Sequence, residues 1–178
     1  MNNIILMGFK GAGKTSTAKV LSKKLKTRYL DIDNVIEKLH EEGREESLAY
    51  RDIRKKYGPE YFCNLECQAV MLAVKENNII IGLGGGTIKT PANIDLLKKN
   101  GVIVYLKVPY KVLLKRIKMK GIPAFLDPTD LEGSMKKELA LREPIYEGIA
   151  DVTINCDDYP ANKVADMVLQ AVKSKQNL

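Results

Sequence analysis

The stretch that decides the fold is Gly8-Phe9-Lys10-Gly11-Ala12-Gly13-Lys14-Thr15, which matches the pattern G-x-x-x-x-G-K-[ST] of a phosphate-binding loop. The apolar run Ile4–Met7 precedes it and predicts a buried strand, and residues 16–25 follow it with apolar side chains at helical spacing. A strand, a glycine-rich loop and a helix in this order turn backbone N–H groups and a helix N-terminus toward a phosphate. The stretch therefore predicts a nucleotide site.

The last residues of the loop have side chains suited to nucleotide chemistry. Lys14 is placed to reach the β- and γ-phosphates, and the hydroxyl group of Thr15 is placed to hold Mg²⁺. A tight glycine turn is the alternative, but such a turn does not need Lys-Thr after its last glycine. The loop predicts a nucleotide as ligand, bound by Gly11, Ala12, Gly13, Lys14, Thr15 and Ser16.

Length and composition predict a single globular domain over residues 1–178, with 45% hydrophobic and 29% charged residues. The net charge of +7 suits a polyanionic ligand, and no basic run with interleaved aromatics indicates nucleic acid.

No segment is apolar enough to predict a membrane span or a leader peptide, so we expect a cytoplasmic protein, as a monomer with a small-molecule substrate. Cys63, Cys67 and Cys156 form no disulfide framework, and with a single histidine they are too few for a closed zinc site.

Four further apolar runs predict strands that alternate with helices: residues 28–30, 79–81, 102–106 and 151–154. Helices are expected from Asp33, over 60–76, from Pro91, from Pro109, over 133–148 and from Pro160, with short helices and turns over 41–58. The pattern predicts an α/β fold in which helices cover both faces of a five-stranded parallel sheet. Glycines and prolines interrupt residues 117–133, which we interpret as a mobile lid.

Two acids follow the second predicted strand, Asp31 and Asp33. Ligands of open α/β sheets lie beyond the carboxyl ends of the strands, so both acids are candidates for the site. A helix cap is an alternative role for Asp33, but it explains only one acid of the pair. After the third strand, Gly84, Gly85 and Gly86 let a ligand approach the backbone, although a flexible turn would need glycines too.

Arg142 interrupts the apolar face of the helix predicted over 133–148. A buried arginine needs an anionic partner, which is either a substrate or Glu138 four residues earlier.

Other phosphate-loop classes fit the chain less well. The base-reading motif N-K-x-D of GTPases fails in Asn162-Lys163-Val164-Ala165, and the D-x-x-G match at residues 130–133 lies in the predicted lid, where we treat it as chance. The strand 79–81 ends in glycine rather than in the acid of motor ATPases, which leaves Asp31 as the best candidate for the Mg²⁺ side. A small chain with a lid favours a kinase of small metabolites.

Over nearly its full length the chain resembles the shikimate kinase family. The matching pieces are the phosphate loop, Asp31-Ile32-Asp33, Gly84–Gly86, the run 142–146 and Pro160. The resemblance implies a P-loop kinase fold and transfer of the γ-phosphoryl group of ATP to shikimate. The expected product is shikimate 3-phosphate, for chorismate and aromatic amino-acid biosynthesis.

The resemblance also implies a role for each matching residue. Lys14 and Asp33 are the catalytic residues, and Asp33 binds the substrate hydroxyls and orients or deprotonates the attacking one. Asp31 helps to hold the water shell of Mg²⁺. Substrate is contacted by the backbone of Gly84, Gly85 and Gly86 and by Arg142, with residues 33–60 as the substrate-binding region, whereas Arg116 and Pro160 lie by the adenine.

Two positions depart from the family pattern. Cys63 stands where the family has an arginine that grips the substrate carboxylate, and Ile122 stands where its lid arginine precedes a proline. Four cations are candidates to replace them: Arg51, Arg54, Lys118 and Lys120. These departures leave two alternatives open: a kinase of another small polyol acid or of a nucleotide, or a nucleotide-binding module without transfer activity.

Overall fold

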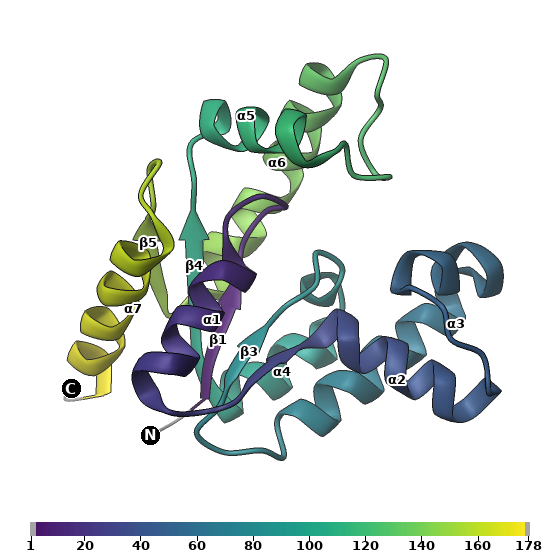
Figure 1. The fold of residues 1–178 in the computed structure, drawn as a ribbon, viewed down its shortest axis with the longest axis horizontal. Helices are drawn as coiled ribbons and strands as arrows, with labels where there is room; N and C mark the ends of the chain where they lie inside the picture. The colour runs from purple at the N-terminus through teal and green to yellow at the C-terminus, as the bar shows by residue number, and fades with distance from the viewer. Residues whose placement is uncertain (1–2, 177–178) are drawn as a thin grey trace.

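Five parallel strands form the centre of the fold (Figure 1). The structure is a computed structural model that describes residues 3–176. The strands are β1 (Asn3–Met7), β2 (Tyr29–Asp31), β3 (Ile80–Gly82), β4 (Gly101–Lys107) and β5 (Val152–Asn155). They lie in the order β2-β3-β1-β4-β5, and every neighbouring pair is parallel. The predicted five-stranded parallel sheet is confirmed.

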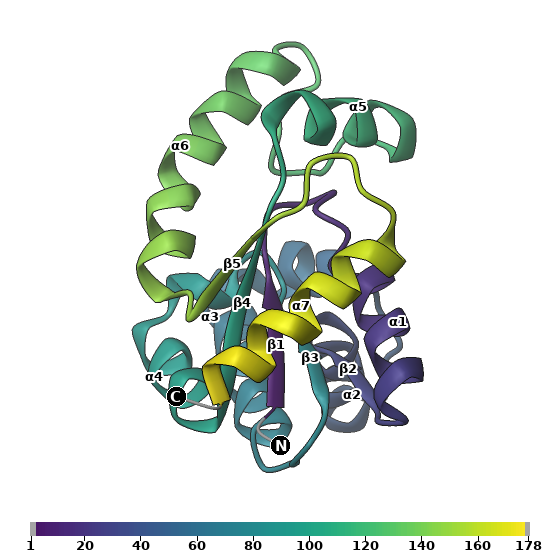
Figure 2. The ribbon, with the colours of Figure 1, turned by 90° about the vertical axis from the view of Figure 1, so that its left-hand side faces the viewer.

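Helices cover both faces of this sheet, as predicted (Figure 2). They are α1 (Lys14–Leu25), α2 (Ile32–Arg44), α3 (Tyr50–Ala73), α4 (Pro91–Asn100), α5 (Tyr110–Lys120), α6 (Leu131–Ile149) and α7 (Ala161–Gln176), with a 3-10 turn η1 at Thr87–Lys89. Alternate side chains of a strand point to opposite faces. Ile4 and Leu6 of β1 accordingly pack with α1, α5 and α7, whereas Ile5 and Met7 pack with α2, α3 and α4.

The helix predicted over 60–76 is the second half of α3, which follows a kink at Gly58 and ends at Ala73, three residues earlier than predicted. Short helices and turns were predicted over 41–58, and the first half of α3 begins there, at Tyr50. At Gly58 the backbone leaves helical geometry (φ 85°, ψ 172°), because the residue before a proline is driven away from the α region. The dipeptide Gly58-Pro59 therefore marks a kink in α3. The first half of the helix, from Tyr50 to the kink, lies within the stretch 41–58.

The projecting pair α2 and α3 has its own packing at its outer end (Figure 1). His40 of α2 is fully buried, and its Nδ1 lies 3.0 Å from the hydroxyl oxygen of Tyr61 on α3. Arg44 lies over the rings of Tyr57 and Tyr61, at 5.3 and 5.5 Å from their centroids. These contacts fix α2 against both halves of α3, so the segment is ordered despite its high charge.

The predicted lid is irregular only in its middle part. Helix α5 extends to Lys120 and α6 begins at Leu131, so both ends of the stretch 117–133 are helical. Gly121, at φ 101°, ends α5, and Leu126 anchors the irregular part because only 4% of it is exposed. Asp130 caps α6 by accepting a hydrogen bond from the backbone N–H of Gly133 (3.0 Å), which explains the D-x-x-G match.

No helix within residues 3–176 combines the length and the apolar character that a membrane crossing requires.

Candidate nucleotide and acceptor site

The phosphate loop depends on glycines for its shape. Gly8, Gly11 and Gly13 have φ angles of 150°, 89° and 91°, which other residues rarely adopt. A side chain at Gly8 would also place its Cβ 2.8 Å from the carbonyl oxygen of Leu106 on β4. Gly13 directly precedes α1, whose first-turn N–H groups have no partners within the helix. The loop therefore presents a concave row of donors to an anion.

Lys14 lies along the inside of this loop. Its Nζ donates to the carbonyl oxygens of Gly8 (2.7 Å) and Phe9 (3.3 Å). Burial lowers the pKa of the Lys14 amine to about 8, and the nearby carboxylate of Asp33 opposes this shift. An anionic ligand beside the amine would restore its full charge, so the loop has the electrostatics of a phosphate site.

A pocket of about 310 Å³ adjoins the loop on the side of α5 and α7. Six of the predicted nucleotide-binding residues line it: Gly11, Ala12, Gly13, Ser16, Arg116 and Pro160. Its other lining residues are Thr17, Met119, Lys120, Cys156, Tyr159, Ala161 and Val164. A mainly apolar pocket with a few polar groups suits the flat base of a nucleotide.

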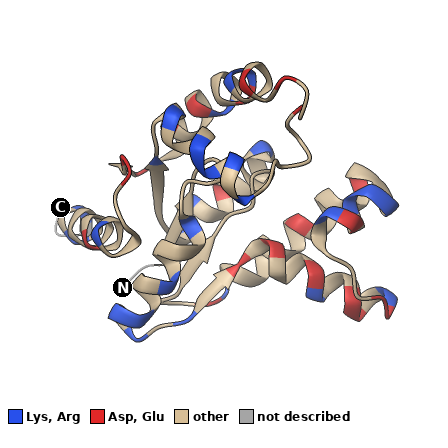
Figure 3. Cartoon of the chain, turned by 45° about the horizontal axis from the view of Figure 1, so that its top comes forward, with Lys and Arg blue, Asp and Glu red and all other residues tan. Residues whose placement is uncertain are grey.

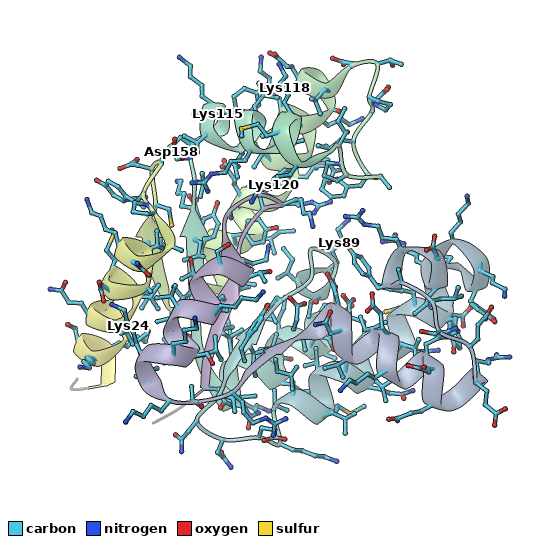
Figure 4. All side chains as sticks on the ribbon, viewed as in Figure 1. Lys24, Lys89, Lys115, Lys118, Lys120 and Asp158 are labelled. Carbon is cyan, nitrogen blue, oxygen red and sulfur yellow. The ribbon has the colours of Figure 1, made fainter. Side chains whose placement is uncertain are left out.

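Arg116 joins the loop to the other wall of this pocket. Its Nη1 donates to the carbonyl oxygen of Gly11 (3.1 Å), and its Nη2 donates to Oδ1 of Asp158 (3.0 Å), which follows β5 (Figure 4). The side chain is 21% exposed, so these contacts are partly shielded from water. Arg116 thus links the phosphate loop to the segment before α7.

We expect Arg116→Ala to raise the dissociation constant of ATP about tenfold, since a charge-assisted hydrogen bond contributes roughly 1.5–3 kcal/mol and this one is partly exposed. Isothermal titration with ATP measures the change. The matched control is Lys115→Ala, because Lys115 lies 3.9 Å from the same Asp158 carboxylate, whereas Arg116 also donates to the loop at Gly11. Equal affinities for both variants would contradict the role given to Arg116.

The two acids after β2 have different structural roles. Asp31 caps α2, and its Oδ1 accepts a hydrogen bond from the backbone N–H of Asp33 (3.1 Å). The alternative prediction of a cap at Asp33 was wrong, because α2 begins at Ile32, two residues earlier than that role requires. The Asp33 carboxylate instead reaches Gly84, where even a Cβ atom would overlap its Oδ1.

Burial raises the pKa of Asp33 to about 6, and the neighbouring charge of Asp31 adds to this effect. The amine of Lys14 opposes the shift, which places Asp33 within electrostatic reach of the phosphate loop. A carboxylate with a raised pKa remains ionised at neutral pH and accepts a proton more readily than an ordinary aspartate.

The three glycines after β3 are each approached by a charged side chain. Asp33 lies against Gly84, and Nη1 of Arg142 lies 3.1 Å from where a Cβ of Gly85 would stand. Oε1 of Glu66 lies 3.2 Å from the corresponding point at Gly86. Because β3 lies between β1 and β2, the triplet lies between the phosphate loop and the acids. The structure thus brings Asp33, Arg142 and the triplet together, with Glu66 as a member that the sequence prediction missed.

Arg142 lies in a nearly closed environment, with 8% of its side chain exposed. The predicted alternative partner is present, because Nη2 and Nε of Arg142 lie 2.5 and 2.8 Å from Oε2 of Glu138. The guanidinium carbon also lies 4.4 Å from the ring centroid of Phe125 and 5.5 Å from that of Phe9. The ion pair uses one edge of the guanidinium group, so Nη1 is left facing Gly85.

Of the two arginines on α3 that were candidates to replace the family's cation, Arg54 has the better position. Arg51 donates from Nε to the hydroxyl of its neighbour Tyr50 (3.0 Å), away from the triplet. Arg54 lies over the ring of Phe62, 5.8 Å from its centroid, and lowers the pKa of Glu66 against the raising effect of burial. Cys63 has its Sγ 3.7 Å from Oγ1 of Thr90. Of these two arginines, Arg54 is therefore the one that acts on Glu66, the carboxyl group beside Gly86.

Three lysines near the site differ in what they contact, and Figure 4 labels all of them. Lys118 pairs with Glu132 at 3.3 Å on the outer side of α5, whereas Lys120 lines the nucleotide pocket. Lys89 was not predicted, although it lies close enough to Glu66 to lower the pKa of that carboxyl group. The signal that could have found it is its place directly after the glycine triplet, in η1.

The donor set near the loop fits Mg²⁺ held jointly with a nucleotide. Within residues 3–176 no group of three or more His, Cys, Asp or Glu side chains could hold a metal ion alone. Mg²⁺ takes oxygen ligands, and with nucleotides it needs only one or two protein groups beside phosphates and water. The hydroxyl of Thr15 and the carboxylate of Asp31 supply this chemistry.

The comparisons with known proteins point to the shikimate kinase family. The model "SKI: Shikimate kinase" matches residues 10–173. Shikimate kinases of Caldanaerobacter subterraneus subsp. tengcongensis and Thermoanaerobacter pseudethanolicus are 37% and 34% identical to this chain, each over 96% of both chains. A shikimate kinase from Acinetobacter baumannii, solved in complex with shikimate, has a TM-score of 0.87 at 28% identity and covers 99% of this chain and 95% of its own. The shikimate kinase structure from Bacteroides thetaiotaomicron has a TM-score of 0.81 at 25% identity, over 99% of both chains.

Proposed function

This chain belongs to the shikimate kinase family, and from that premise we propose that it transfers the γ-phosphoryl group of ATP to the 3-hydroxyl group of shikimate. The product would be shikimate 3-phosphate, for chorismate and aromatic amino-acid biosynthesis. One observation carries the proposal: the Asp33 carboxylate and Arg142 meet at consecutive glycines beside the phosphate loop. A hydroxyl acid bound there would have its alcohol at Asp33 and its carboxylate at Arg142.

On the nucleotide side, the backbone N–H groups of residues 11–16 and the amine of Lys14 bind the phosphates. Arg116 and Pro160 enclose the base in the adjoining pocket. Thr15 and Asp31 are the residues that would hold Mg²⁺, which neutralises phosphate charge when bound. Phosphoryl transfer asks the protein mainly for alignment and charge stabilisation, and these groups supply both.

On the acceptor side, Asp33 aligns the attacking hydroxyl group and takes its proton as the bond to phosphorus forms. Its raised pKa favours this step, because burial makes the protonated form less costly. The backbone of Gly84–Gly86 contacts the ring of the acceptor, and Arg142 binds its carboxylate through the Nη1 edge that the Glu138 pair leaves available. The acceptor is thereby held in line with the phosphate loop.

The positive charge that Cys63 does not provide comes, in this proposal, from Arg54 and Lys89. Both act on the same carboxyl group, Glu66, which is 4% exposed and hydrogen-bonded to Thr87 (2.9 Å). Glu66 lies against Gly86, so the two cations act next to the last glycine of the triplet, whereas Asp33 lies at the first. Lys120, at the nucleotide pocket, takes the place of the lid arginine that Ile122 does not supply.

We expect the double variant Arg54→Gln/Lys89→Gln to raise KM for shikimate about ten- to a hundredfold, because each of these exposed side chains contributes roughly 0.7–1.4 kcal/mol, and 1.4 kcal/mol is a factor of ten. Neither cation contacts the phosphates in this proposal, so kcat should change little. Steady-state kinetics at saturating ATP measures both constants. Arg51→Gln is the matched control, and a KM unchanged in the double variant would exclude Arg54 and Lys89 from the carboxylate site.

Residues 117–133 act as a lid in this proposal, and Phe125 is the residue that closes it. Its ring lies on the guanidinium group of Arg142 and makes an edge contact with Phe9 of the phosphate loop, 5.8 Å between centroids. Contact with both halves of the site excludes water, which would otherwise accept the phosphoryl group. A monomeric state and a cytoplasmic location stay predictions.

A coupled assay of ADP release distinguishes the acceptors. Shikimate should raise the rate far above the ATP-only blank, whereas nucleoside monophosphates should not. A rate that rises only with another polyol acid or with a nucleotide would identify a divergent kinase. ATP binding without any acceptor-dependent turnover would identify a nucleotide-binding module.

A further inference from the structure

Tyr29 lies beside one of the acids assigned to Mg²⁺. It stands two residues before Asp31, which ends β2 at the edge of the sheet, next to β3. Residues two apart on a strand share a face, so Tyr29 and Asp31 point to the same side of the sheet. The Tyr29 ring packs in the cluster that contains Ala18 and Leu21 of α1. That face of the sheet is therefore the one covered by α1.

The hydroxyl group of Tyr29 holds one oxygen of Asp31. It donates to Oδ2 at 2.5 Å, while Oδ1 accepts the backbone N–H of Asp33. Each carboxylate oxygen has two acceptor sites, so both oxygens can still accept a further hydrogen bond from water. The Asp31 carboxylate is thereby fixed in orientation from both sides without being saturated.

Gly82 makes the space that the phenol occupies. It is the residue of β3 paired with Asp31, and a Cβ there would lie 2.8 Å from the Tyr29 hydroxyl oxygen and 3.1 Å from its ring carbon Cε2. An isolated glycine within a strand indicates such a close approach. The ring lies across the end of β3, in the direction of β1 and its loop.

We propose that Tyr29 is a positioning residue for the Mg²⁺ site, holding the Asp31 carboxylate in a fixed orientation beside Gly82. The proposal rests on the proposed function only in assigning Asp31 to Mg²⁺. Tyr29 itself neither binds the metal nor touches a substrate. Partners that orient metal ligands in this way typically raise metal affinity about ten- to a hundredfold.

The test is Tyr29→Phe, which keeps the ring and removes only the hydroxyl group. Binding of Mn²⁺ to the enzyme in the presence of saturating ADP, followed by electron paramagnetic resonance, should weaken about tenfold. The Mg²⁺ concentration needed for half-maximal rate should rise in parallel, and kcat should recover at high Mg²⁺. Gly82→Ala, which displaces the phenol, should give the same change in metal affinity.

The matched control is Tyr110→Phe, because that hydroxyl lies on the surface of α5, 3.4 Å from the carbonyl oxygen of Glu132. Mn²⁺ affinity of Tyr29→Phe equal to that of Tyr110→Phe would overturn the proposal. Loss of kcat that high Mg²⁺ does not restore would overturn it too, since it would give Tyr29 a catalytic role. The Mn²⁺ measurement contains no acceptor, so it decides this question even if shikimate proves not to be the substrate.

Discussion

Asp33→Asn is expected to lower kcat by about 10²–10⁴-fold, the usual contribution of a positioned general base, and to leave ATP affinity unchanged. The amide keeps the shape of the side chain at Gly84 but cannot take the proton of the attacking hydroxyl. Rapid-quench kinetics and a separate ATP titration measure the two effects. Glu41→Gln, on the exposed side of the same helix, is the control. Loss of ATP binding in Asp33→Asn would contradict the role given to Asp33.

The same substitution should make the protein more stable at neutral pH. The pKa of Asp33 is about 6 in the folded state, above the value near 4 of an unfolded chain. Its stabilising contribution is therefore complete below pH 4 and lost as the pH rises through about 6. At pH 7.5 the ionised, half-buried carboxylate of Asp33 destabilises the folded state. Asp33→Asn should therefore raise the free energy of unfolding by about 1–2 kcal/mol. Thermal unfolding at pH 4 and pH 7.5 measures this difference, which should vanish at the lower pH.

Lys14→Met is the second variant with a large expected effect. The methionine keeps most of the side-chain length but removes the charge that stabilises the transferring phosphoryl group. Loss of one such preorganised donor costs about 10²–10³-fold in kcat, and ATP affinity should fall as well. The matched control is Lys10→Met, which removes a lysine from the same loop whose side chain is exposed. Pre-steady-state transfer rates should separate the two variants by orders of magnitude, and similar rates would contradict the assignment of Lys14.

Local sequence patterns were sufficient for the parts of the fold that depend on neighbouring residues. The strand before Gly8, the loop and the helix after it follow one another without interruption, so their relation needs no tertiary information. The same holds for the glycines after β3 and for the acids after β2. Which of Asp31 and Asp33 caps α2 could not be predicted, because either residue can cap a helix that begins in their neighbourhood.

Residues whose roles depend on partners across the sheet were missed. Tyr29 acts through Asp31 and Gly82 on two strands, and Lys89 acts near Glu66 from a different segment of the chain. Arg54 gains its position from the kink at Gly58, which turns the two halves of α3 relative to each other. Figure 3 shows basic and acidic residues intermingled along α2 and α3, so charge alone did not distinguish Arg54 from Arg51. Such roles follow from tertiary packing, which single-sequence patterns do not contain.

The central claim is that one site, with the Lys14 loop on one side and Asp33 and Arg142 on the other, phosphorylates shikimate at its 3-hydroxyl group. The most direct measurement is ³¹P NMR of a reaction containing the wild-type protein, ATP, Mg²⁺ and shikimate, with Asp33→Asn in parallel. We predict a phosphomonoester signal coupled to the proton on carbon 3 of shikimate, which appears with the wild type as ATP is consumed and is absent with Asp33→Asn. Consumption of ATP with only inorganic phosphate as product, or the same phosphomonoester formed at an equal rate by Asp33→Asn, would contradict the account.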